Sequence, residues 1–461
     1  MPPSFQTSLF IFRRDLRVAD NLGLNAALAQ SKQVIACFIL DPRQIEPHPY
    51  QSRAGLQFMV EALTDLQQQL QAQGGQLHFF QDSAPGVIRH LQQTQGIDAV
   101  YVNRDYTPFS QQRDLEIARV CNELGVHFHT QADALLNEPE DILNGNGQPY
   151  QVFTAFYKRC RQNPVDLPRP LLAKRFMKLD SSFDDSCLNL LRQPHNNATI
   201  GGRSPAVALL EDLGRCRDYA EQRDFPALSA TSDLSAYLKF GCCSVREAYY
   251  AVLQQLGSEH SLLRQFYWRD FFHHIAFHFP KVFGHAFHSQ YDAIVWRNDR
   301  EDFQRWADGH TGFPIVDAGM RQLKQTGTLH NRVRMIVASF LVKDLHISWR
   351  WGERYFAQHL VDYDPCVNNG NWQWAASTGC DAQPYFRIFN PWLQQQRFDP
   401  DCVYIKRWIP ELRSFSPKVI QQWHKTPLAG TYPRPMLDHG ERSQQAKRLY
   451  QQAAVIARNE T

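Results

Sequence analysis

Five short apolar runs constrain the fold of the first part of this chain, because helix-like stretches separate most of them. The first two runs do not alternate polar with apolar residues, which is typical of strands buried on both faces of a sheet. This alternation of strands and helices predicts an α/β fold over residues 1–136, with a doubly wound parallel sheet. The runs cover residues 8–12, 33–40, 76–80, 99–102 and 126–128, and the helical patterns cover residues 54–71, 85–93 and 111–124.

The pattern changes after residue 136. Residues 137–205 contain Asn-Gly-Asn-Gly at 144–147 and several prolines and serines, which predicts a connector with one helix near 152–161. From residue 206 to residue 461 the helical period dominates and strand patterns nearly vanish. The sequence therefore predicts an all-α C-terminal domain after the connector.

Composition excludes several classes of protein. The net charge of +3 excludes a uniformly basic nucleic-acid coat but leaves room for a local basic patch. No apolar run approaches the roughly 18 residues of a membrane helix, and the N-terminus lacks a secretory pattern. The ten cysteines have no metal-ligand spacing, which is typical of reduced thiols. We expect a cytoplasmic protein without membrane contact, and a monomer.

The tryptophans are unevenly distributed. All ten lie between Trp268 and Trp423. Indoles are large, flat and suited to stacking, so this half of the chain is a candidate for binding a planar ligand or a nucleobase, or for carrying an electron. The alternative is an aromatic core.

Two polar segments are candidate ligand sites. The loop 231–235 carries Ser and Thr and precedes a helical stretch, which suits an anion such as phosphate or, alternatively, simple helix capping. Arg334, Asp362 and Asp364 combine one cation with two carboxylates, which suits the edge of a heterocycle or, alternatively, an ion pair.

Two further segments suit nucleic acid. Segment 321–354 holds seven Lys or Arg against two acidic residues, with tryptophans interleaved, which suits a DNA backbone or a solvated helix face. Gln265 and Trp268 are three residues apart on a predicted helix, 262–277, and therefore share a face. His274 and His278 have zinc-pair spacing but no evident third ligand, so we expect no metal.

Several longer motifs resemble the DNA photolyase/cryptochrome family, and the resemblance covers nearly the whole chain. Residues 12–21, Phe-Arg-Arg-Asp-Leu-Arg-Val-Ala-Asp-Asn, are similar to the family's Phe-Arg-x-Asp-Leu-Arg-x-x-Asp-Asn. Motifs of this length in this order are specific, and they are most similar to the bacterial-type (class I) branch that repairs cyclobutane pyrimidine dimers. The other matching stretches are 231–235, 268–271, 312–318, 330–332 and 372–390.

The resemblance implies an FAD cofactor in the helical domain. Asn368 matches the residue that faces flavin N5. Trp372, Trp349 and Trp296 match a chain that relays electrons between the surface and the flavin. The matching residues around the phosphates are Tyr219, Thr231, Ser232, Leu234 and Ser235, and those around the flavin ring are Arg334, Asp362, Asp364 and Asn368.

The resemblance also implies ultraviolet-damaged DNA as the partner. Trp268 and Trp374 match two indoles that clasp the dimer after it has flipped out of the duplex. In the family, excited FADH⁻ passes an electron to the dimer, the ring splits and the electron returns. The implied activity is thus a light-driven carbon–carbon lyase reaction. Further implied DNA contacts are Gln265, Arg269, Asn331, Arg332 and Met335.

Departures from the family pattern keep two alternatives open. Gln265 stands where the dimer-repair branch has Glu, Thr328 stands where it has Trp, and Asp233 replaces a common Arg in the phosphate loop. One alternative is repair of (6-4) photoproducts, although that branch has a His pair where this chain has His330-Asn331. The other is a cryptochrome-type blue-light receptor without repair.

A second chromophore is common in the N-terminal domain of this family. Residues 105–110 lack the Asn-Glu pair typical of folate binders. A deazaflavin, a flavin or an empty antenna site is therefore at least as consistent with the sequence as a folate.

Overall fold

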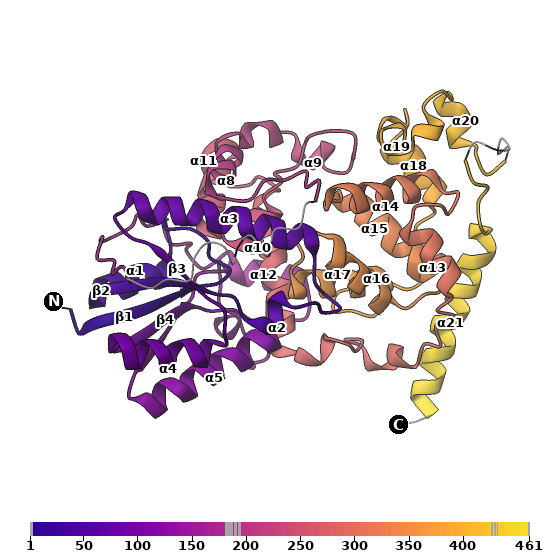
Figure 1. The fold of residues 1–461 in the computed structure, drawn as a ribbon. Coiled ribbons are helices and arrows are strands. Elements are labelled where there is room, and N and C mark those ends of the chain that lie inside the picture. The colour runs from indigo at the N-terminus through magenta and orange to yellow at the C-terminus, as the bar shows by residue number, and fades with distance from the viewer. Residues whose placement is uncertain are drawn as a thin grey trace. The chain divides into compact units, whose positions relative to one another are not determined.

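The computed structural model describes residues 3–179, 188, 191, 195–425, 427, 430 and 432–459 (Figure 1). The chain forms two compact units, which we describe separately. Unit 1 comprises Met1–His195, Thr199–Arg217 and Ser232–His278. Unit 2 comprises Asn196–Ala198, Asp218–Thr231 and Phe279–Thr461.

Unit 1 is built around a parallel sheet of five strands in the order β3-β2-β1-β4-β5. Leu9 pairs with Ile35 on one side and with Val100 on the other. The predicted α/β fold with a doubly wound parallel sheet is confirmed, and each of the five apolar runs forms a strand. The strands are β1 (Phe5–Phe12), β2 (Ser31–Ile39), β3 (Leu77–Phe80), β4 (Ala99–Asn103) and β5 (His127–Gln131).

Helices cover both faces of this sheet (Figure 1). One core cluster joins Leu9, Ile35 and Val100 of the sheet to Ile88 of α4 and Ile117 of α5. The helices of unit 1 are α1 (Leu22–Gln30), α2 (Pro42–Ile45), α3 (Arg53–Ala72), α4 (Ala84–Gln95), α5 (Pro108–Leu124), η1 (Pro139–Asp141), α6 (Phe153–Cys160), α8 (Arg203–Glu211), η2 (Leu213–Cys216), α10 (Ser235–Phe240), α11 (Val245–Leu256) and α12 (Leu263–His278).

Local sequence explains where most of the sheet-covering helices begin and end. Ser52, Ser83 and Thr107 cap α3, α4 and α5 through their side-chain oxygens. Gly96 and Gly125 end α4 and α5 in the left-handed conformation that glycine adopts without strain. Helix α1 was not predicted, because it is buried around most of its circumference and so has no amphipathic period.

A buried ion cluster joins the sheet part of unit 1 to α11. Arg246 lies 2.8 Å from Asp133 and 2.9 Å from Asp20, and Arg17 lies 2.6 Å from Asp133. Each side chain is at most 5% exposed. Because a buried charge is costly without its partners, these four residues depend on one another.

Helix α12 is anchored to the chain just after β5. The carboxylate of Asp270 accepts hydrogen bonds from the backbone N–H groups of Leu136 (2.9 Å) and Asn137 (3.1 Å). Burial raises the pKa of Asp270 to about 7, although Arg269 and the two N–H groups oppose this shift. Asp270 therefore changes its charge near neutral pH.

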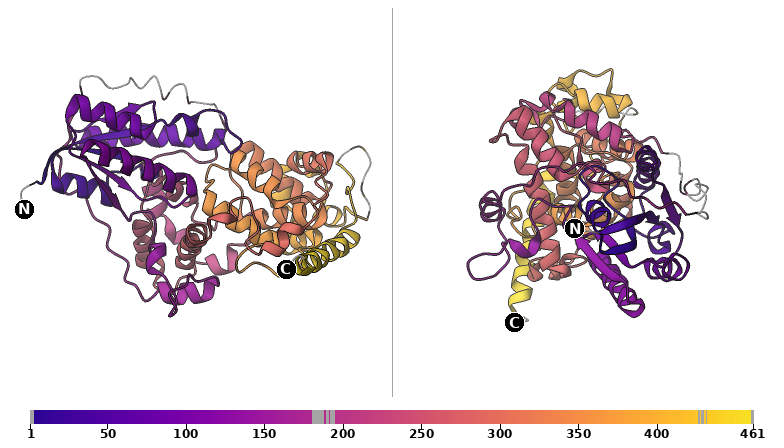
Figure 2. Two further views of the ribbon diagram at one scale, coloured as in Figure 1. Left: turned by 90° about the horizontal axis from the view of Figure 1, so that it is seen from below. Right: turned by 90° about the vertical axis from the view of Figure 1, so that its left-hand side faces the viewer.

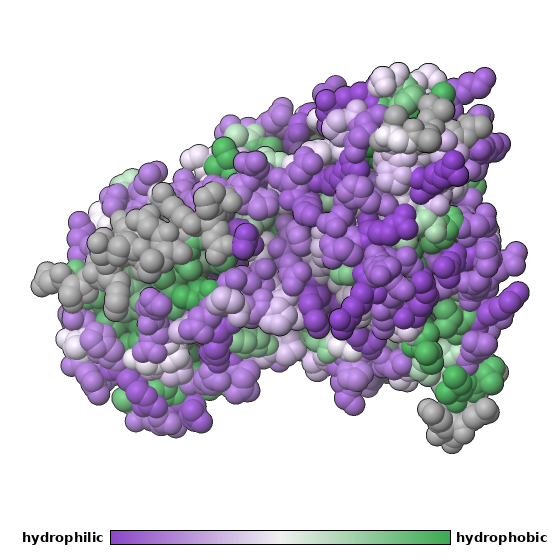
Figure 3. All heavy atoms as spheres, turned by 45° about the vertical axis from the view of Figure 1, so that its right-hand side comes forward, coloured by the Kyte–Doolittle hydropathy of each residue, from purple (hydrophilic) through white to green (hydrophobic). Residues whose placement is uncertain are grey.

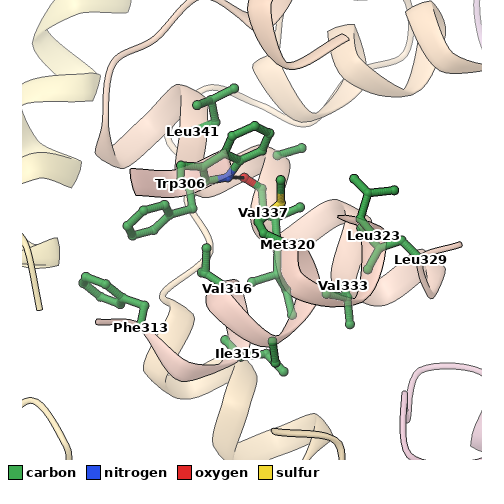
Figure 4. Packing of buried hydrophobic residues seen from close by; sticks show 14 of the residues in the cluster. Trp306, Phe313, Ile315, Val316, Met320, Leu323, Leu329, Val333, Val337 and Leu341 are labelled. Atoms are coloured by element: carbon green, nitrogen blue, oxygen red, sulfur yellow. Dashed lines mark hydrogen bonds between the residues drawn. The ribbon is translucent and has the colours of Figure 1, made fainter. Parts of the chain in front are cut away.

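Unit 2 is helical, as predicted for the C-terminal part of the chain. Trp306 lies in its core beside Val316, Val337 and Leu341, and the indole N–H donates to the carbonyl of Val337 at 3.1 Å (Figure 4). The elements are α9 (Tyr219–Gln222), η3 (Pro280–Val282), η4 (Ser289–Ala293), α13 (Arg300–Ala307), α14 (Pro314–Thr326), α15 (Asn331–Ser339), the π-helical η5 (Phe340–Asp344), α16 (Trp349–His359), α17 (Pro365–Ala376), α18 (Pro391–Phe398), α19 (Val403–Trp408), η6 (Pro410–Leu412), α20 (Pro417–Gln421) and α21 (His439–Asn459).

The C-terminal helix α21 lies on the outside of unit 2 and packs against η4 and η5 (Figure 2). Beneath it, the ammonium group of Lys343 donates to the hydroxyl of Ser377 at 3.0 Å and lies 3.6 Å from the ring centre of Tyr450. Burial lowers the pKa of Lys343 well below its ordinary value. Helix α21 thus contributes Tyr450 to the buried surroundings of Lys343.

Within the described part of the chain, no helix combines the length and apolar character needed to cross a membrane. The face of the molecule drawn in Figure 3 is mostly hydrophilic. An apolar patch lies near the C-terminal end of α21, where Val455 and Ile456 are 57% and 40% exposed (Figure 3).

Candidate functional site

Helix α17 presents two of the predicted site residues on one face. Asn368 and Trp372 are four residues apart, so they lie one above the other. The side-chain amide nitrogen of Asn368 donates to the backbone carbonyl of Glu353 (3.1 Å) and to its carboxylate (3.4 Å). The amide oxygen of Asn368 is therefore the atom with which the N–H group of a ligand can pair.

Trp372 is fixed by close packing and is only 2% exposed. Its ring lies edge-on to Phe356 at 4.9 Å and to Trp306 at 6.4 Å between ring centres. Its six-membered ring also fills the space above Gly352, where a Cβ atom would collide with the indole. Helix α16 thus holds Trp372 in one orientation.

Two tryptophans of the predicted relay, Trp349 and Trp372, belong to one core cluster, and the third, Trp296, packs against it. Trp349, the first residue of α16, is 1% exposed, whereas Trp296 is half-buried and packs against the cluster. The ring of Trp296 lies edge-on to Tyr450 of α21, with 6.3 Å between ring centres. Trp306, which sequence reasoning did not single out, contacts Trp372 directly.

Arg334, Asp362 and Asp364 have distinct local roles. Arg334 Nη2 donates to both carboxylate oxygens of Asp362, at 3.1 and 2.9 Å, and its Nε donates to the carbonyl of Leu329 at 2.7 Å. Asp364 caps α17 by accepting from the backbone N–H of Val367 at 3.1 Å. The ion-pair interpretation therefore holds for Arg334 and Asp362, and the pair is rigid enough to orient a ligand.

The predicted phosphate loop is divided between the two units. In unit 2, Tyr219 is 8% exposed and lies under the guanidinium of Arg223, and Thr231 is half-buried. In unit 1, Leu234 is the N-cap residue of α10 and makes no side-chain cap, while Ser232 and Ser235 carry hydroxyls beside it. Uncapped N–H groups next to hydroxyls suit an anion.

Asp233 is compatible with an anion in this loop because its charge is paired. Its carboxylate accepts from Arg215 Nη2 at 3.0 Å, and the same nitrogen donates to the carbonyl of Ser232 at 3.2 Å. The side chain of Asp233 is 57% exposed. Arg215 thus offsets the negative charge that replaces the family's common Arg.

The predicted DNA contacts on α12 lie in unit 1. Gln265 and Trp268 are both half-buried and lie on the same face of the helix. Arg269 instead donates from Nη1 to the backbone carbonyl of Ala134 at 2.7 Å, and its side chain is 14% exposed. Arg269 therefore attaches α12 to the segment after β5.

The predicted DNA contacts of unit 2 lie on α15 and α17. Asn331 is exposed, and its amide nitrogen lies 3.7 Å from the sulfur of Met335. Arg332 is paired with Asp224 at 2.8 Å and lies over the ring of Phe398. Trp374 is half-buried, two residues beyond Trp372 and hence on another face of α17.

Gln373 is a buried residue that sequence reasoning missed, although it stands inside the Trp-Gln-Trp motif. Its amide oxygen accepts from the backbone N–H of Phe287 at 2.8 Å. Its amide nitrogen donates to the carbonyls of Val282 (3.1 Å) and His285 (3.0 Å) and to the side chain of Asn369 (3.1 Å). Gln373 thus fixes the loop after η3 to the helix that carries Asn368.

Comparison with known proteins identifies the family to which the chain is similar. Residues 262–452 match the FAD binding domain of DNA photolyase, and residues 8–172 match the DNA photolyase family. The chain is 40% identical to a deoxyribodipyrimidine photo-lyase of Synechococcus sp., over 98% of each chain. The described helical residues therefore form an FAD binding domain.

Two solved photolyase structures are similar to this chain over nearly its whole length. The chain superimposes on an archaeal photolyase from Sulfolobus tokodaii with a TM-score of 0.89 at 43% identity, over 97% of this chain and 100% of that one. That structure holds two FAD molecules and is described as implying a novel light-harvesting cofactor. A bacterial class III photolyase from Agrobacterium tumefaciens superimposes with a TM-score of 0.91 at 35% identity, over 97% and 98%.

Proposed function

Because the chain belongs to the DNA photolyase family, we propose that it is a deoxyribodipyrimidine photo-lyase, which splits cyclobutane pyrimidine dimers in ultraviolet-damaged DNA with the energy of light. When bound, FAD supplies the light-excited electron that opens the cyclobutane ring. The observation that carries the proposal is the position of Asn368, locked by Glu353 one helical turn from the buried Trp372.

The residues of the candidate site fit a flavin dinucleotide. The amide oxygen of Asn368 can accept from a flavin N–H, and the Arg334–Asp362 pair can orient the polar edge of the ring. The uncapped start of α10 and the neighbouring hydroxyls suit the diphosphate. We assign cofactor binding to Tyr219, Thr231, Ser232, Leu234, Ser235, Arg334, Asp362, Asp364 and Asn368.

The tryptophans of unit 2 provide a route for electrons. We assign relay to Trp296, Trp349 and Trp372, because Trp349 and Trp372 are buried in one hydrophobic cluster and the half-buried Trp296 packs against that cluster. Trp372→Phe should abolish photoreduction of the bound, oxidised flavin and leave repair by chemically reduced enzyme intact. Trp423→Phe, which changes a buried tryptophan outside this route, is the control. Undiminished photoreduction in Trp372→Phe would exclude the route.

Lesion binding is assigned to the aromatic and polar side chains that match the family's DNA contacts. Trp268 and Trp374 would stack on the flipped dimer, with Gln265, Arg269, Asn331, Arg332 and Met335 as further DNA contacts. Loss of one base stack costs roughly 1–3 kcal/mol, so Trp268→Ala should weaken binding to dimer-containing DNA roughly 5- to 150-fold. Binding to undamaged DNA should change little, because it depends on phosphate contacts.

A paired repair assay tests the substrate. The purified protein is illuminated with one oligonucleotide that carries a cyclobutane thymine dimer and another that carries a (6-4) photoproduct, with dark controls. We expect light-dependent repair of the first only. Repair of the (6-4) lesion alone would reassign the substrate, and repair of neither by flavin-loaded, reduced protein would favour a light receptor.

A second chromophore of the flavin or deazaflavin class is part of the proposal. Its support is the 43% identical Sulfolobus tokodaii structure, which holds two FAD molecules. Released chromophores should amount to about two per chain, one FAD and one antenna chromophore. A yield of one FAD and nothing else would remove the antenna from the proposal.

The finer organisation is proposed as well. Residues 1–136 would form the antenna-type domain, residues 137–205 the connector and residues 206–461 the FAD- and DNA-binding part. We also propose a monomer located in the cytoplasm. The location agrees with the nine described cysteines, which are all buried and form no disulfide with one another.

A further inference from the structure

One face of the Trp268 indole is already covered in the protein. The ring of Phe153, from α6, lies parallel to it, with 3.6 Å between ring centres and 8° between ring planes. This spacing is van der Waals contact over nearly the whole ring. Phe153 is 1% exposed, whereas Trp268 is half-buried. A base that stacks on Trp268 must therefore use the opposite face.

Phe153 itself belongs to a wider aromatic stack. Tyr157, one turn along α6, is parallel to Phe153 within 13° at 5.7 Å, and the guanidinium of Arg264 lies 5.1 Å from the Phe153 ring centre. Phe271 stands edge-on to both Phe153 (5.7 Å) and Trp268 (5.8 Å). Trp268 is thus fixed on one face and along one edge.

We propose that Phe153 is a positioning residue that holds the Trp268 indole ready to receive a flipped pyrimidine dimer. The proposal rests on the lesion-stacking role of Trp268 described above. A side chain that is already ordered loses less conformational freedom when a ligand binds, so ordering it in advance strengthens binding. The segment between the sheet and the helical residues therefore contributes to substrate recognition through α6.

Phe156 provides a matched control on the same helix. It is also 1% exposed, and its ring contacts among the described residues are with Phe271 (5.3 Å) and His274 (5.1 Å). Phe153→Leu and Phe156→Leu each remove one buried ring from the packing of α6 on α12. Only Phe153→Leu uncovers Trp268.

The experiment measures dissociation constants in the dark for the FAD-loaded protein. One single-stranded oligonucleotide carries a cyclobutane thymine dimer, and its twin is undamaged. Phe153→Leu should weaken binding to the damaged strand about 2- to 10-fold, which corresponds to one side chain losing its order in the free protein. The affinity of Phe153→Leu for the undamaged strand should stay within about 2-fold of the unmodified protein, because that strand does not stack on Trp268. Both affinities of Phe156→Leu should also stay within about 2-fold, because this variant leaves Trp268 covered by Phe153.

A double-mutant cycle with Trp268→Ala decides whether Phe153 acts through the indole. In the Trp268→Ala background, Phe153→Leu should have no further effect on binding to the damaged strand. An equal loss with and without Trp268, or equal losses in Phe153→Leu and Phe156→Leu, would overturn the proposal. If Phe153→Leu does not fold, Phe153→Met, which keeps an apolar side chain of similar length, is put through the same cycle.

The cycle also separates this proposal from the proposed function. If Trp268→Ala binds damaged DNA as tightly as the unmodified protein, the stacking role of Trp268 fails and the positioning role fails with it. If Trp268→Ala loses affinity while Phe153→Leu and Phe153→Met do not, the stacking role stands and the positioning role of Phe153 is wrong.

Discussion

Gly352→Ala should destabilise unit 2 through a collision with Trp372. A Cβ atom at this position would lie 2.6 Å from Cδ2 of Leu341 and closer still to Cζ3 and Cη2 of Trp372. Carbon atoms in contact are normally about 3.5–4.0 Å apart, so the indole must move by roughly 1 Å or more. The indole cannot yield freely, because Phe356 and Trp306 lie against it.

The magnitude follows from two opposing effects. Overpacking of a tight core costs about 1–3 kcal/mol, and collision with a rigid ring belongs at the upper end of that range. Replacing a helical glycine by alanine gains about 1 kcal/mol. The net loss in the free energy of unfolding should therefore be about 2 kcal/mol.

Gly440→Ala is the control for this prediction. Gly440 lies in α21, is exposed, and its Cβ atom would meet only the carboxylate of Asp438 at 3.1 Å, so the helix gain should appear without the collision. Tryptophan fluorescence during urea denaturation is the assay, because every tryptophan except Trp268 belongs to unit 2. Equal urea midpoints for the two variants would refute the packing argument. We also expect Gly352→Ala to retain less FAD, because Trp372 and Asn368 share one face of α17.

Three further predictions concern buried polar groups. Because the pKa of Asp270 is raised to about 7, its carboxyl group binds a proton more tightly in the folded protein than in the unfolded chain, so the free energy of unfolding falls as the pH rises from about 4 to about 7. Thermal unfolding measured across this pH range should show a smaller decline in stability for Asp270→Asn than for the unmodified protein. An equal decline in the two proteins would contradict the assignment. Arg246→Met should lower the free energy of unfolding by about 3–5 kcal/mol, because it removes a positive charge that pairs with the buried carboxylates of Asp20 and Asp133. Arg89→Met is the control, because it removes an ion pair that is about half exposed at both ends, and it should cost at most about 1 kcal/mol in the same denaturation assay. Gln373→Leu should make the loop 282–287 susceptible to limited proteolysis, because backbone groups of Val282, His285 and Phe287 lose their hydrogen-bond partner. If the loop of this variant resists the protease as well as that of the unmodified protein, packing alone holds the loop.

The sheet was predictable because its signals are local. A buried parallel strand is a continuous apolar run, and each of the five runs became a strand. Helix α1 was missed for the opposite reason, since Leu24, Ala27 and Leu28 are fully buried and polar residues do not mark an outer face. The periodicity of a sequence reveals a helix only when one side of that helix meets water.

The site was predictable only where the chain resembles known sequences. Motif order indicated Asn368 and Trp372, but no pattern indicated Gln373, whose backbone partners lie about 90 residues away along the chain. Phe153 is a comparable case, because a single phenylalanine in a connector carries no signal. Its contact with Trp268 exists only after α6 has packed against α12.

The ion cluster of unit 1 has a consequence for protein engineering. A natural place to cut or exchange the N-terminal part would be after residue 136, a few residues beyond the last strand of the sheet. Such a fragment would carry Asp20 and Asp133 away from Arg246 of α11 and would remove the attachment of α12 at Leu136. A chimera that borrows this sheet from a relative should therefore take the segment through α12 from the same parent. The transplantable module is defined by which residues neutralise one another, and it extends along the gene well beyond the last strand of the sheet.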